Sequence, residues 1–282
     1  MKDIINNENN HLVFDGCDTT CLVKEYGSPL YVVSESEIDR RCQILKSRFI
    51  DKFENVAVAY ASKAFLNLAM CRIIDNHGMH LDVVSGGELF IALNADFPAE
   101  KIFFHGNNKS IDELELAISN GVGRIVVDNI YELELIQAIA KEHNKKVAIL
   151  FRVTPGVDSN THKYIITGQK DSKFGIPLVD GIIFDAIEMA MEFENISLKG
   201  FHFHVGSQIF DNTSHIEATK VLMEVIFEAK KRFGFTTQEL NTGGGFGIHY
   251  VNGDMPRELE YFTDAIMETV STKAKEYNVK VP

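Results

Sequence analysis

The sequence predicts an α/β protein of the (β/α)8 barrel type that lacks its eighth strand. Three observations indicate this fold. The first five apolar, β-rich runs start roughly every 22 to 24 residues, amphipathic segments separate them, and polar residues stand at the C-terminal end of nearly every run. A doubly wound sheet would also alternate strands with helices. The even spacing and the polar strand ends favour the barrel, because barrel enzymes keep their chemistry at that end.

Seven strands are expected in the repeat. They are Val56–Tyr60, His80–Ser85, Ile102–His105, Arg124–Asp128, Val147–Val153, Leu198–Val205 and Glu239–Thr242. Apolar residues at helical spacing predict helices around Leu66–Ile74, Ile111–Ile118, Leu133–Ala140, Ile182–Glu194, Ile216–Arg232 and Leu259–Tyr277. Asn278–Pro282 resembles the approach to an eighth strand, so we expect residues 30–282 to form an incomplete barrel.

Residues 1–29 stand outside the repeat. Leu12–Glu25 is a strand-like region, and Leu30–Val33 is strand-like again after a turn. Ser34 and Glu37 have the spacing of a capping box, which predicts the start of a helix. We expect segment 1–29 to belong to another layer or to a second domain.

Composition is that of a soluble globular protein. The net charge of −12 argues against a nucleic-acid partner, and the hydrophobic content of 45% is ordinary. No apolar run is long enough to cross a membrane, and the polar N-terminus lacks the apolar core of a signal peptide. The four cysteines show no paired CxxC spacing, so we expect reduced thiols and a cytoplasmic location.

Lys63 closes the run Val56–Ser62, which has the composition of a buried strand, at the point where a helix should begin. Burying an ammonium without a partner is costly. A partly desolvated lysine is more easily deprotonated and can form a Schiff base with a carbonyl compound or with pyridoxal phosphate. Taken alone, Lys63 favours a simpler interpretation, a lysine that extends out of a strand end. The rest of the chain reverses that preference.

Gly243, Gly244 and Gly245 follow the seventh strand. Successive glycines let backbone N–H groups face a phosphate without obstruction by Cβ, and the last strands of a barrel are the usual phosphate site. A dinucleotide fingerprint fits worse, because the spacing is not G-x-G-x-x-G and no helix follows at once. A tight turn without a ligand is the remaining alternative.

His202 and His204 are two residues apart on a predicted strand and should share one face. Such a pair can bind zinc, with His105 as a further ligand, and would then indicate a zinc hydrolase. A histidine ring can instead stack on an aromatic cofactor whose phosphate Ser207 binds, while His202 fits a satisfied core histidine equally well. With Lys63 and the glycines, pyridoxal phosphate is the simplest cofactor that uses every feature.

Several motifs also occur in a recognisable order. They are Tyr60-Ala61-Ser62-Lys63-Ala64, Asp82-Val83-Val84-Ser85-Gly86-Gly87-Glu88, His105-Gly106-Asn107-Asn108-Lys109-Ser110, His202-Phe203-His204-Val205-Gly206-Ser207-Gln208 and Gly243-Gly244-Gly245. These motifs resemble the fold-type III pyridoxal-phosphate-dependent decarboxylases, which have an alanine racemase-like barrel. A further set resembles the diaminopimelate decarboxylases within that family: Pro155-Gly156-Val157-Asp158, His162-Lys163-Tyr164-Ile165, Thr167-Gly168 and Asp171-Ser172-Lys173-Phe174-Gly175. The resemblance runs from about Leu12 to the end of the chain.

The resemblance implies a pyridoxal 5'-phosphate site built from Lys63, Asp82, Glu88, His204, Ser207, Gly243, Gly244 and Gly245. Lys63 would hold the cofactor as a Schiff base, and His204 would stack on its ring. Ser207 and the three glycines would hold the phosphate. Asp82 and Glu88 would support the lysine side of the ring.

The resemblance further implies a small-molecule amino-acid substrate, meso-2,6-diaminopimelate, which is decarboxylated to L-lysine and carbon dioxide in an enzyme that is usually a homodimer. It implies that segment 1–29 joins a C-terminal β-domain. Neither that domain, with its cysteine proton donor, nor the family's Glu-Pro-Gly-Arg motif is in this sequence. We therefore expect a fragment with little activity alone. Two alternatives stay open, a single-domain pyridoxal-phosphate-binding protein without decarboxylase activity and a non-catalytic binding partner.

Overall fold

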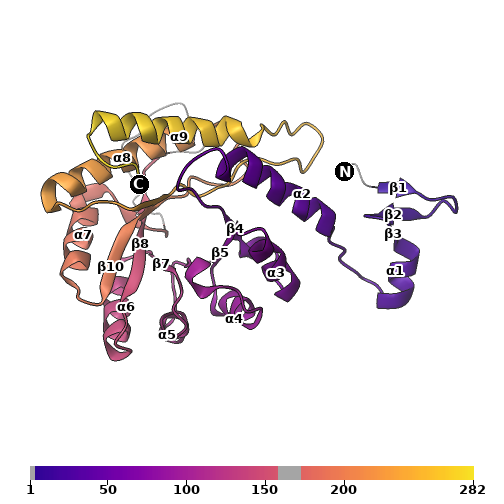
Figure 1. Cartoon of the computed structure of the whole chain (residues 1–282), viewed down its shortest axis with the longest axis horizontal. Helices are drawn as coiled ribbons and strands as arrows, with labels where there is room; N and C mark the ends of the chain where they lie inside the picture. Colours follow the sequence, from indigo (N-terminus) through magenta and orange to yellow (C-terminus); the bar gives the residue numbers. More distant parts are fainter. Residues whose placement is uncertain (1–3, 158–172) are drawn as a thin grey trace. The chain divides into compact units, whose positions relative to one another are not determined.

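The computed structural model describes residues 4–157 and 173–282. The chain separates into two compact units, the N-terminal unit Met1–Glu54 and the barrel unit Asn55–Pro282 (Figure 1). The parts of the predicted motifs at Asp158, at residues 162–168 and at residues 171–172 lie outside the described residues.

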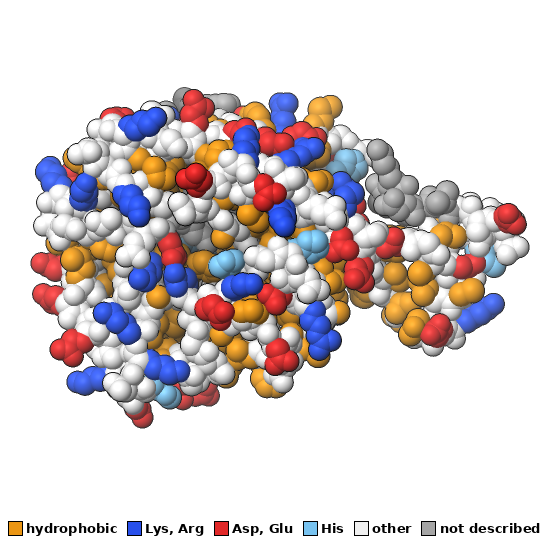
Figure 2. Space-filling model, in the orientation of Figure 1, with side chains coloured by type: hydrophobic (Ala, Val, Ile, Leu, Met, Phe, Trp, Pro, Cys, Tyr) orange, Lys and Arg blue, Asp and Glu red, His pale blue; other side chains and the backbone are white. Residues whose placement is uncertain are grey.

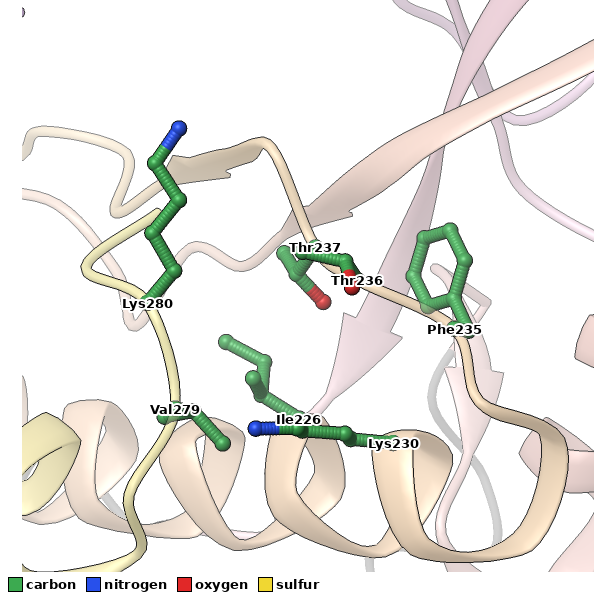
Figure 3. A pocket seen from close by; sticks show the side chains of 7 residues that line it. All are labelled: Ile226, Lys230, Phe235, Thr236, Thr237, Val279 and Lys280. Atoms are coloured by element: carbon green, nitrogen blue, oxygen red, sulfur yellow. The ribbon is translucent and has the colours of Figure 1, made fainter.

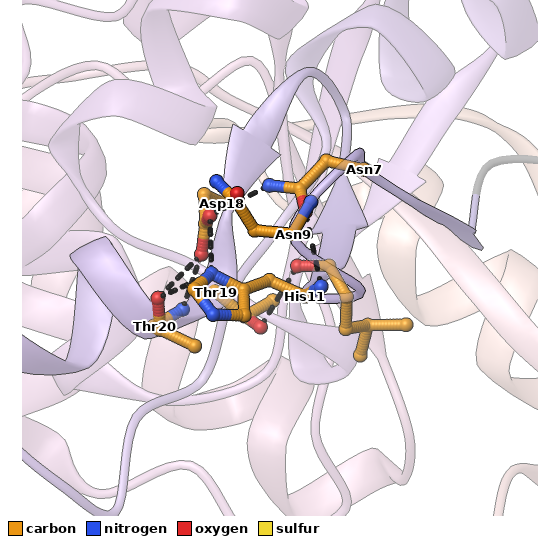
Figure 4. Close-up of polar contacts among 7 residues, drawn as sticks. Asn7, Asn9, His11, Asp18, Thr19 and Thr20 are labelled. Atoms are coloured by element: carbon orange, nitrogen blue, oxygen red, sulfur yellow. Dashed lines mark hydrogen bonds and ion pairs between the residues drawn. The ribbon is translucent and has the colours of Figure 1, made fainter.

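The N-terminal unit contains a small antiparallel sheet and two helices. Its elements are β1 (Ile4–Asn6), β2 (Leu12–Phe14), β3 (Cys17–Asp18), α1 (Thr19–Tyr26), α2 (Glu35–Leu45) and a π-helical turn at Lys46–Ile50. Asp18 connects the sheet to α1. Its carboxylate accepts hydrogen bonds from Thr20 N–H and Asn7 Nδ2, each at 2.8 Å, and lies 2.9 Å from His11 Nδ1 (Figure 4). Contacts with Thr20 and then His11 lower the pKa of the Asp18 carboxyl.

Two predictions for the N-terminal unit need correction. The region Leu12–Glu25 holds two short strands but continues as the helix α1, which Asp18 caps. Leu30–Val33 forms no strand, and its residues are exposed, Tyr31 to 97%. A β-rich composition yields a strand only where a neighbouring strand supplies hydrogen bonds and packing, and none of the described strands pairs with this segment.

The start of α2 agrees with prediction in part. Ser34 Oγ accepts a hydrogen bond from Glu37 N–H at 3.1 Å, as a helix cap should. The Glu37 carboxylate binds Arg40 and Arg41 instead of turning back to Ser34 N–H. Two arginines within one helical turn compete with the backbone donor, so the predicted capping box is only half formed.

The barrel unit is built on a parallel sheet. Its strands are β4 (Ala59–Ala61), β5 (His80–Val83), β6 (Ile102–Phe104), β7 (Arg124–Val127), β8 (Val147–Thr154), β9 (Ile176–Pro177), β10 (Ile196–His202) and β11 (Glu239–Asn241). The order across the sheet is β11-β10-β8-β7-β6-β5-β4, and the short β9 adds to β8. All these pairings are parallel. The seven predicted strands are confirmed; β9 was not predicted.

Helices come after the strands along the chain and cover the outer face of the sheet (Figure 1). They are α3 (Leu68–Asn76), α4 (Gly86–Asn94), α5 (Ile111–Ser119), α6 (Ile130–Glu142), α7 (Ile182–Glu192), α8 (Thr213–Phe233) and α9 (Leu259–Glu276), with 3₁₀ turns at Ser62–Ala64, Ala99–Lys101 and Val179–Gly181. Within the described residues no pairing joins β11 to β4. The structure is therefore an open, incomplete barrel, which confirms the predicted fold class.

Burial differs between the middle and the edge of this sheet. In the central strand β8 five apolar side chains are buried: Val147, Ile149, Leu150, Phe151 and Val153. Helices cover one face of such a strand and barrel side chains fill the other. In the edge strand β4 every residue is only half-buried. The run Val56–Ser62 is therefore less buried than its composition predicts, and Ser62 is its one buried residue.

A cavity of about 170 Å³ lies at the amino end of β11, away from the carboxyl ends of the strands (Figure 3). It is lined by Ile226, Lys230, Phe235, Thr236, Thr237, Val279 and Lys280. Lys230 Nζ donates a hydrogen bond to Asn278 O at 2.7 Å. The predicted chemistry belongs to the other end of the strands, so this cavity takes no part in it.

None of the helices that the structure describes is both long enough and apolar enough to cross a membrane. The cysteines are free thiols, Cys17 and Cys21 exposed, Cys42 and Cys71 buried. On the face of the barrel unit drawn in Figure 2, acidic and basic side chains are interspersed.

Candidate active site

The predicted site residues lie at the carboxyl ends of adjacent parallel strands. In chain order the polar residues there are Lys63 after β4, Asp82 in β5, His105 after β6, Asp128 after β7, Arg152 in β8, His202 and His204 at the end of β10, and Gly243 to Gly245 after β11. Strand register sets Arg152, His202 and Asn241 level with one another across β8, β10 and β11. The fold thus brings side chains far apart in sequence to one mouth.

Lys63 lies in the 3₁₀ turn directly after β4. The buried hydroxyl of Ser62 donates a hydrogen bond to Asp82 O of β5 at 2.7 Å and so fixes the turn to the next strand. The Lys63 side chain is exposed. The expected partial burial was wrong, because β4 is an edge strand in an open sheet and covers little of the turn after it.

Although exposed, the Lys63 ammonium lies close to two other predicted residues. Burial is the largest influence on the pKa of the Asp82 carboxyl and of the His204 imidazole, and the positive charge of Lys63 opposes it at Asp82 and adds to it at His204. Such shifts need short separations, because solvent screens exposed charges strongly. Lys63 therefore faces the mouth with its amine available.

Asp82 is a half-buried acid, its side chain 27% exposed, with an unusual protonation state. Burial, and then the nearby Glu88, raise the pKa of its carboxyl to about 7, against the opposing charges of Lys63 and Arg152. Its Oδ1 has no hydrogen-bond partner among the described residues and lies 3.6 Å from His105 Nε2. At neutral pH the carboxyl is therefore poised between its two protonation states.

Glu88 supports the site through the backbone. It stands in the first turn of α4, where its N–H donates to Ser85 Oγ at 3.3 Å. Its carboxylate accepts a hydrogen bond from Val84 N–H at 2.7 Å. Glu88 thus holds the turn between β5 and α4 and lies close enough to Asp82 to raise the pKa of that acid.

His105 and His202 form a buried pair beside Asp82. Their rings meet edge to face, with centroids 4.5 Å apart and planes at 78°. Burial lowers the pKa of both imidazoles well below the usual range, so both rings are neutral. His105 Nε2 and His202 Nδ1 are buried without a hydrogen-bond partner among the described residues. Buried polar atoms of this kind usually await a ligand or an ordered water.

His204 packs against the glycine turn. A Cβ placed on Gly243 would lie 2.9 Å from His204 Nδ1 and 2.6 Å from Phe203 O, and one on Gly245 would lie 3.3 Å from His204 Cε1. Gly243 and Gly245 have φ of +67° and +86°, which favours glycine. Burial, then the charges of Lys63 and Arg152, lower the pKa of His204 to about 4, so its ring is neutral at neutral pH.

The glycine turn leaves two backbone donors free. Among the described residues, nothing accepts a hydrogen bond from Gly244 N–H or Gly245 N–H. A Cβ on Gly244 would meet no atom within 4 Å, so the space beside this residue is open. The exposed Ser207 lies in the loop that packs on the turn, because a Cβ on Gly245 would collide with Gly206 O.

Arg152 lies at the carboxyl end of β8, where polar strand ends were predicted in general but this residue was given no role. Its guanidinium lies 4.3 Å from the Phe174 ring and 3.9 Å from Asp128 Oδ1, and its charge lowers the pKa of His105, His202 and His204. Asn241, whose Oδ1 accepts from Gly243 N–H at 2.9 Å, was missed. An Asn two residues before a glycine is an Asx-turn signal that could have found it.

The zinc alternative gains no support from the geometry. β10 ends at His202, so the strand alternation that would place His202 and His204 on one face stops there. The ring of His202 meets His105, whereas the ring of His204 meets the glycines. Within the described residues, no three His, Cys, Asp or Glu side chains gather as a metal site.

The residues present fit pyridoxal phosphate. An exposed lysine amine lies near a neutral imidazole, and that imidazole packs on a turn that requires glycine at Gly243 and Gly245. Two unpartnered N–H groups of the turn can bind an anion, and the unpartnered Asp82 Oδ1 lies nearby. Three separate requirements of the cofactor, an amine, a flat ring surface and a phosphate cradle, are therefore met in one place.

Residues 35–281 match the family model described as the pyridoxal binding domain of the pyridoxal-dependent decarboxylases. The chain belongs to the pyridoxal-dependent decarboxylase family, and the predicted family and cofactor are confirmed. It is 44% identical over 276 residues to diaminopimelate decarboxylase of Bacillus subtilis, over 98% of this chain and 63% of that protein. It is 45% identical over 276 residues to diaminopimelate decarboxylase of Bacillus methanolicus, over 98% of this chain and 64% of that protein.

The fold is also similar to a solved structure. The crystal structure of diaminopimelate decarboxylase from Methanocaldococcus jannaschii with L-lysine superposes with a TM-score of 0.89 at 37% identity, over 99% of this chain and 64% of that chain. This chain spans about 63% of the length of the curated relatives it matches.

Proposed function

We propose that this chain holds pyridoxal 5'-phosphate on Lys63 and serves in the decarboxylation of meso-2,6-diaminopimelate to L-lysine and carbon dioxide. The observation that carries the proposal is the convergence of Lys63, the neutral His204 ring and the glycine turn at one mouth. The similarity to diaminopimelate decarboxylases along nearly the whole chain supports the choice of substrate.

Each residue of the chain has a distinct part in this proposal. Lys63 supplies the amine that attaches the cofactor, and the neutral ring of His204 gives it a flat surface to stack on. Ser207 and the amides of Gly244 and Gly245 bind the phosphate, and Gly243 lets the turn approach His204 closely. The bound cofactor supplies an electron sink for the carbanion left when carbon dioxide departs.

Asp82 and Glu88 act on the lysine side of the site. With a pKa of about 7, Asp82 can hold a proton on its carboxyl at neutral pH and release it with little cost. Glu88 keeps the β5–α4 turn in place and favours the protonated form of Asp82. Arg152 and the buried pair His105 and His202 add positive charge and neutral rings around that acid.

The proposal is tested by mixing the protein with pyridoxal 5'-phosphate and meso-2,6-diaminopimelate and measuring carbon dioxide and L-lysine. We expect slow release, because the chain spans only about 63% of the length of its relatives. The release should be stereospecific and depend on Lys63, with the L,L isomer of diaminopimelate as a matched control that lacks the D-centre. A protein that binds the cofactor on Lys63 but releases no carbon dioxide would instead support the alternative function, a pyridoxal-phosphate-binding protein without decarboxylase activity.

Three further proposals concern organisation. The first is that segment 1–29 joins a β-domain, which agrees with a family match that begins only at residue 35. Limited proteolysis should then cleave between this segment and the barrel.

The second is that the protein forms a homodimer. Light scattering should give twice the mass of one chain, and the mass of a single chain would contradict this. The protein is also proposed to be cytoplasmic, as expected from the sequence; cell fractionation that finds it outside the cytoplasm would contradict this.

A further inference from the structure

A histidine that sequence reasoning did not single out lies behind the glycine turn. His215 is in the first turn of α8 and is fully buried. Its Nε2 lies 2.9 Å from Gly244 O. Its ring packs against Phe246 and Phe262, with centroids 5.1 and 5.6 Å away. His215 directly precedes the predicted helix Ile216–Arg232, so the sequence pattern assigned it no role.

The hydrogen bond fixes the protonation of this imidazole. A carbonyl oxygen can only accept, so His215 Nε2 must carry the proton. The other ring nitrogen, Nδ1, is buried and has no hydrogen-bond partner in the part of the chain that the structure describes. Burial lowers the pKa of His215, which keeps the ring neutral. His215 is thus a neutral hydrogen-bond donor, and the atom that accepts its Nε2 proton is the carbonyl oxygen of Gly244.

The geometry of a peptide bond transmits this contact to the other side of the turn. Gly244 C=O and Gly245 N–H belong to one planar trans peptide, in which the two groups point in opposite directions. A carbonyl held toward His215 therefore directs Gly245 N–H away from His215. Two other peptides of the turn are held separately. Asn241 Oδ1 accepts a hydrogen bond from Gly243 N–H, in the Thr242–Gly243 peptide, at 2.9 Å, and Ile209 N–H donates to Gly245 O, in the Gly245–Phe246 peptide, at 3.0 Å.

We propose that His215 is a positioning residue for the phosphate site: it donates from Nε2 to Gly244 O and so aims Gly245 N–H at the phosphate of the bound cofactor. This inference rests on the proposed function, because it assumes that the glycine turn receives that phosphate. It adds a residue from α8, behind the turn, that acts on the cofactor only through the backbone. Without it the Gly244–Gly245 peptide can rotate and its N–H no longer has a fixed direction.

The test compares two ligands that differ only in the phosphate, pyridoxal 5'-phosphate and pyridoxal. Their binding to Lys63 is measured by absorbance in the wild-type protein, in His215→Phe and in His215→Gln. Phenylalanine fills the aromatic surroundings but has no donor, whereas glutamine places an amide N–H near the position of Nε2. We expect His215→Phe to lose on the order of fivefold of the preference for the phosphorylated ligand, with unchanged pyridoxal binding. His215→Gln should recover most of the preference.

Two outcomes would overturn the inference alone: an unchanged preference in His215→Phe, or equal losses for both ligands together with a lower melting temperature, which would indicate a packing role. A wild-type protein with no preference for the phosphorylated ligand would overturn the proposed phosphate site, and the inference with it. Nitrogen-15 NMR of the unmutated protein gives a second reading, since the proton of His215 must reside on Nε2. A proton on Nδ1 would contradict the inference even if the variants fail to fold.

Discussion

Lys63 and Lys109 both lie in loops after barrel strands, yet their surroundings are opposite. The Lys109 side chain is 1% exposed, and its Nζ donates to Gly106 O, Val126 O and Glu132 Oε1 at 2.9, 2.8 and 2.6 Å. Lys63 is exposed, and no described residue forms a hydrogen bond or ion pair with its Nζ. An ammonium has three N–H donors, and at Lys109 all of them are in use.

The difference separates a structural lysine from one that is available for chemistry. The other carboxylate oxygen of Glu132 accepts Asp128 N–H at 2.9 Å, so the Lys109–Glu132 pair ties together the ends of β6 and β7. Every polar atom of that pair has a partner. Around Lys63, by contrast, the buried atoms Asp82 Oδ1, His105 Nε2 and His202 Nδ1 have none among the described residues. Saturated polar groups stabilise a fold, whereas unpartnered ones leave room for a ligand.

The largest effect should come from Lys63→Ala. We expect complete loss of the visible absorbance band that attached cofactor gives, because the amine of Lys109 is buried and fully hydrogen-bonded and cannot replace it. Stability without cofactor should change by no more than about 0.5 kcal/mol, since the Lys63 side chain is exposed. Lys63→Arg is the matched control that keeps the charge. A band that persists in Lys63→Ala would assign the attachment to another lysine.

Lys109→Met should give the next largest effect, on folding rather than on attachment. Glu132 would be left buried without its partner, which costs about 3–5 kcal/mol of unfolding free energy. Urea unfolding measures the loss, and the double variant Lys109→Met/Glu132→Gln should recover much of it, because a neutral amide no longer needs a cation. A folded Lys109→Met protein that has lost the cofactor band would reverse the roles given to the two lysines.

The glycine turn offers a matched pair of substitutions. Gly245 has φ of +86° and a Cβ there would collide with Gly206 O, whereas a Cβ on Gly244 meets nothing within 4 Å. We expect Gly245→Ala to lower the unfolding free energy by about 1–3 kcal/mol and Gly244→Ala to change it by less than about 0.5 kcal/mol. Urea titrations without cofactor measure both. Equal effects would show that the turn does not have this conformation.

The smallest effect concerns pH and Asp82. The pKa of this carboxyl is raised from 3.8 to about 7, so its contribution to stability is complete below pH 4 and is lost as pH rises through 7. Asp82→Asn keeps the neutral form at every pH. Relative to the wild type it should therefore gain roughly 1–2 kcal/mol between pH 6 and pH 8. Unfolding curves of both proteins at both pH values measure this difference. An advantage of Asp82→Asn over the wild type that grows as the pH falls would contradict the raised pKa of Asp82.

Much of this arrangement could be predicted from the sequence, because it depends on local patterns. The strand repeat placed Lys63, Asp82 and the glycines at carboxyl ends, and parallel strands bring such ends together. The prediction of a strand at Leu30–Val33 was wrong because a β-rich segment needs a partner strand, and composition does not reveal whether one is present. The exposure of Lys63 was missed for a related reason, since the sequence does not show that β4 is a sheet edge.

Other features depend on contacts between distant residues and leave no local signal. Lys109 and Glu132 are 23 residues apart, and His215 lies 29 residues before Gly244. A lysine in a loop and a glutamate on a helix both suggest exposed residues until the fold buries them. The raised pKa of Asp82 likewise arises from burial and from Glu88, which only the folded chain brings near it.

The most direct test of the role given to Lys63 is to trap the cofactor where it is attached. Reduction of the protein with borohydride in the presence of pyridoxal 5'-phosphate, followed by proteolysis and mass spectrometry, identifies the modified lysine. We predict one stoichiometric label, on Lys63, with Lys109 unmodified because its amine is buried and fully hydrogen-bonded. A label on Lys109, or no label at Lys63, would contradict that role.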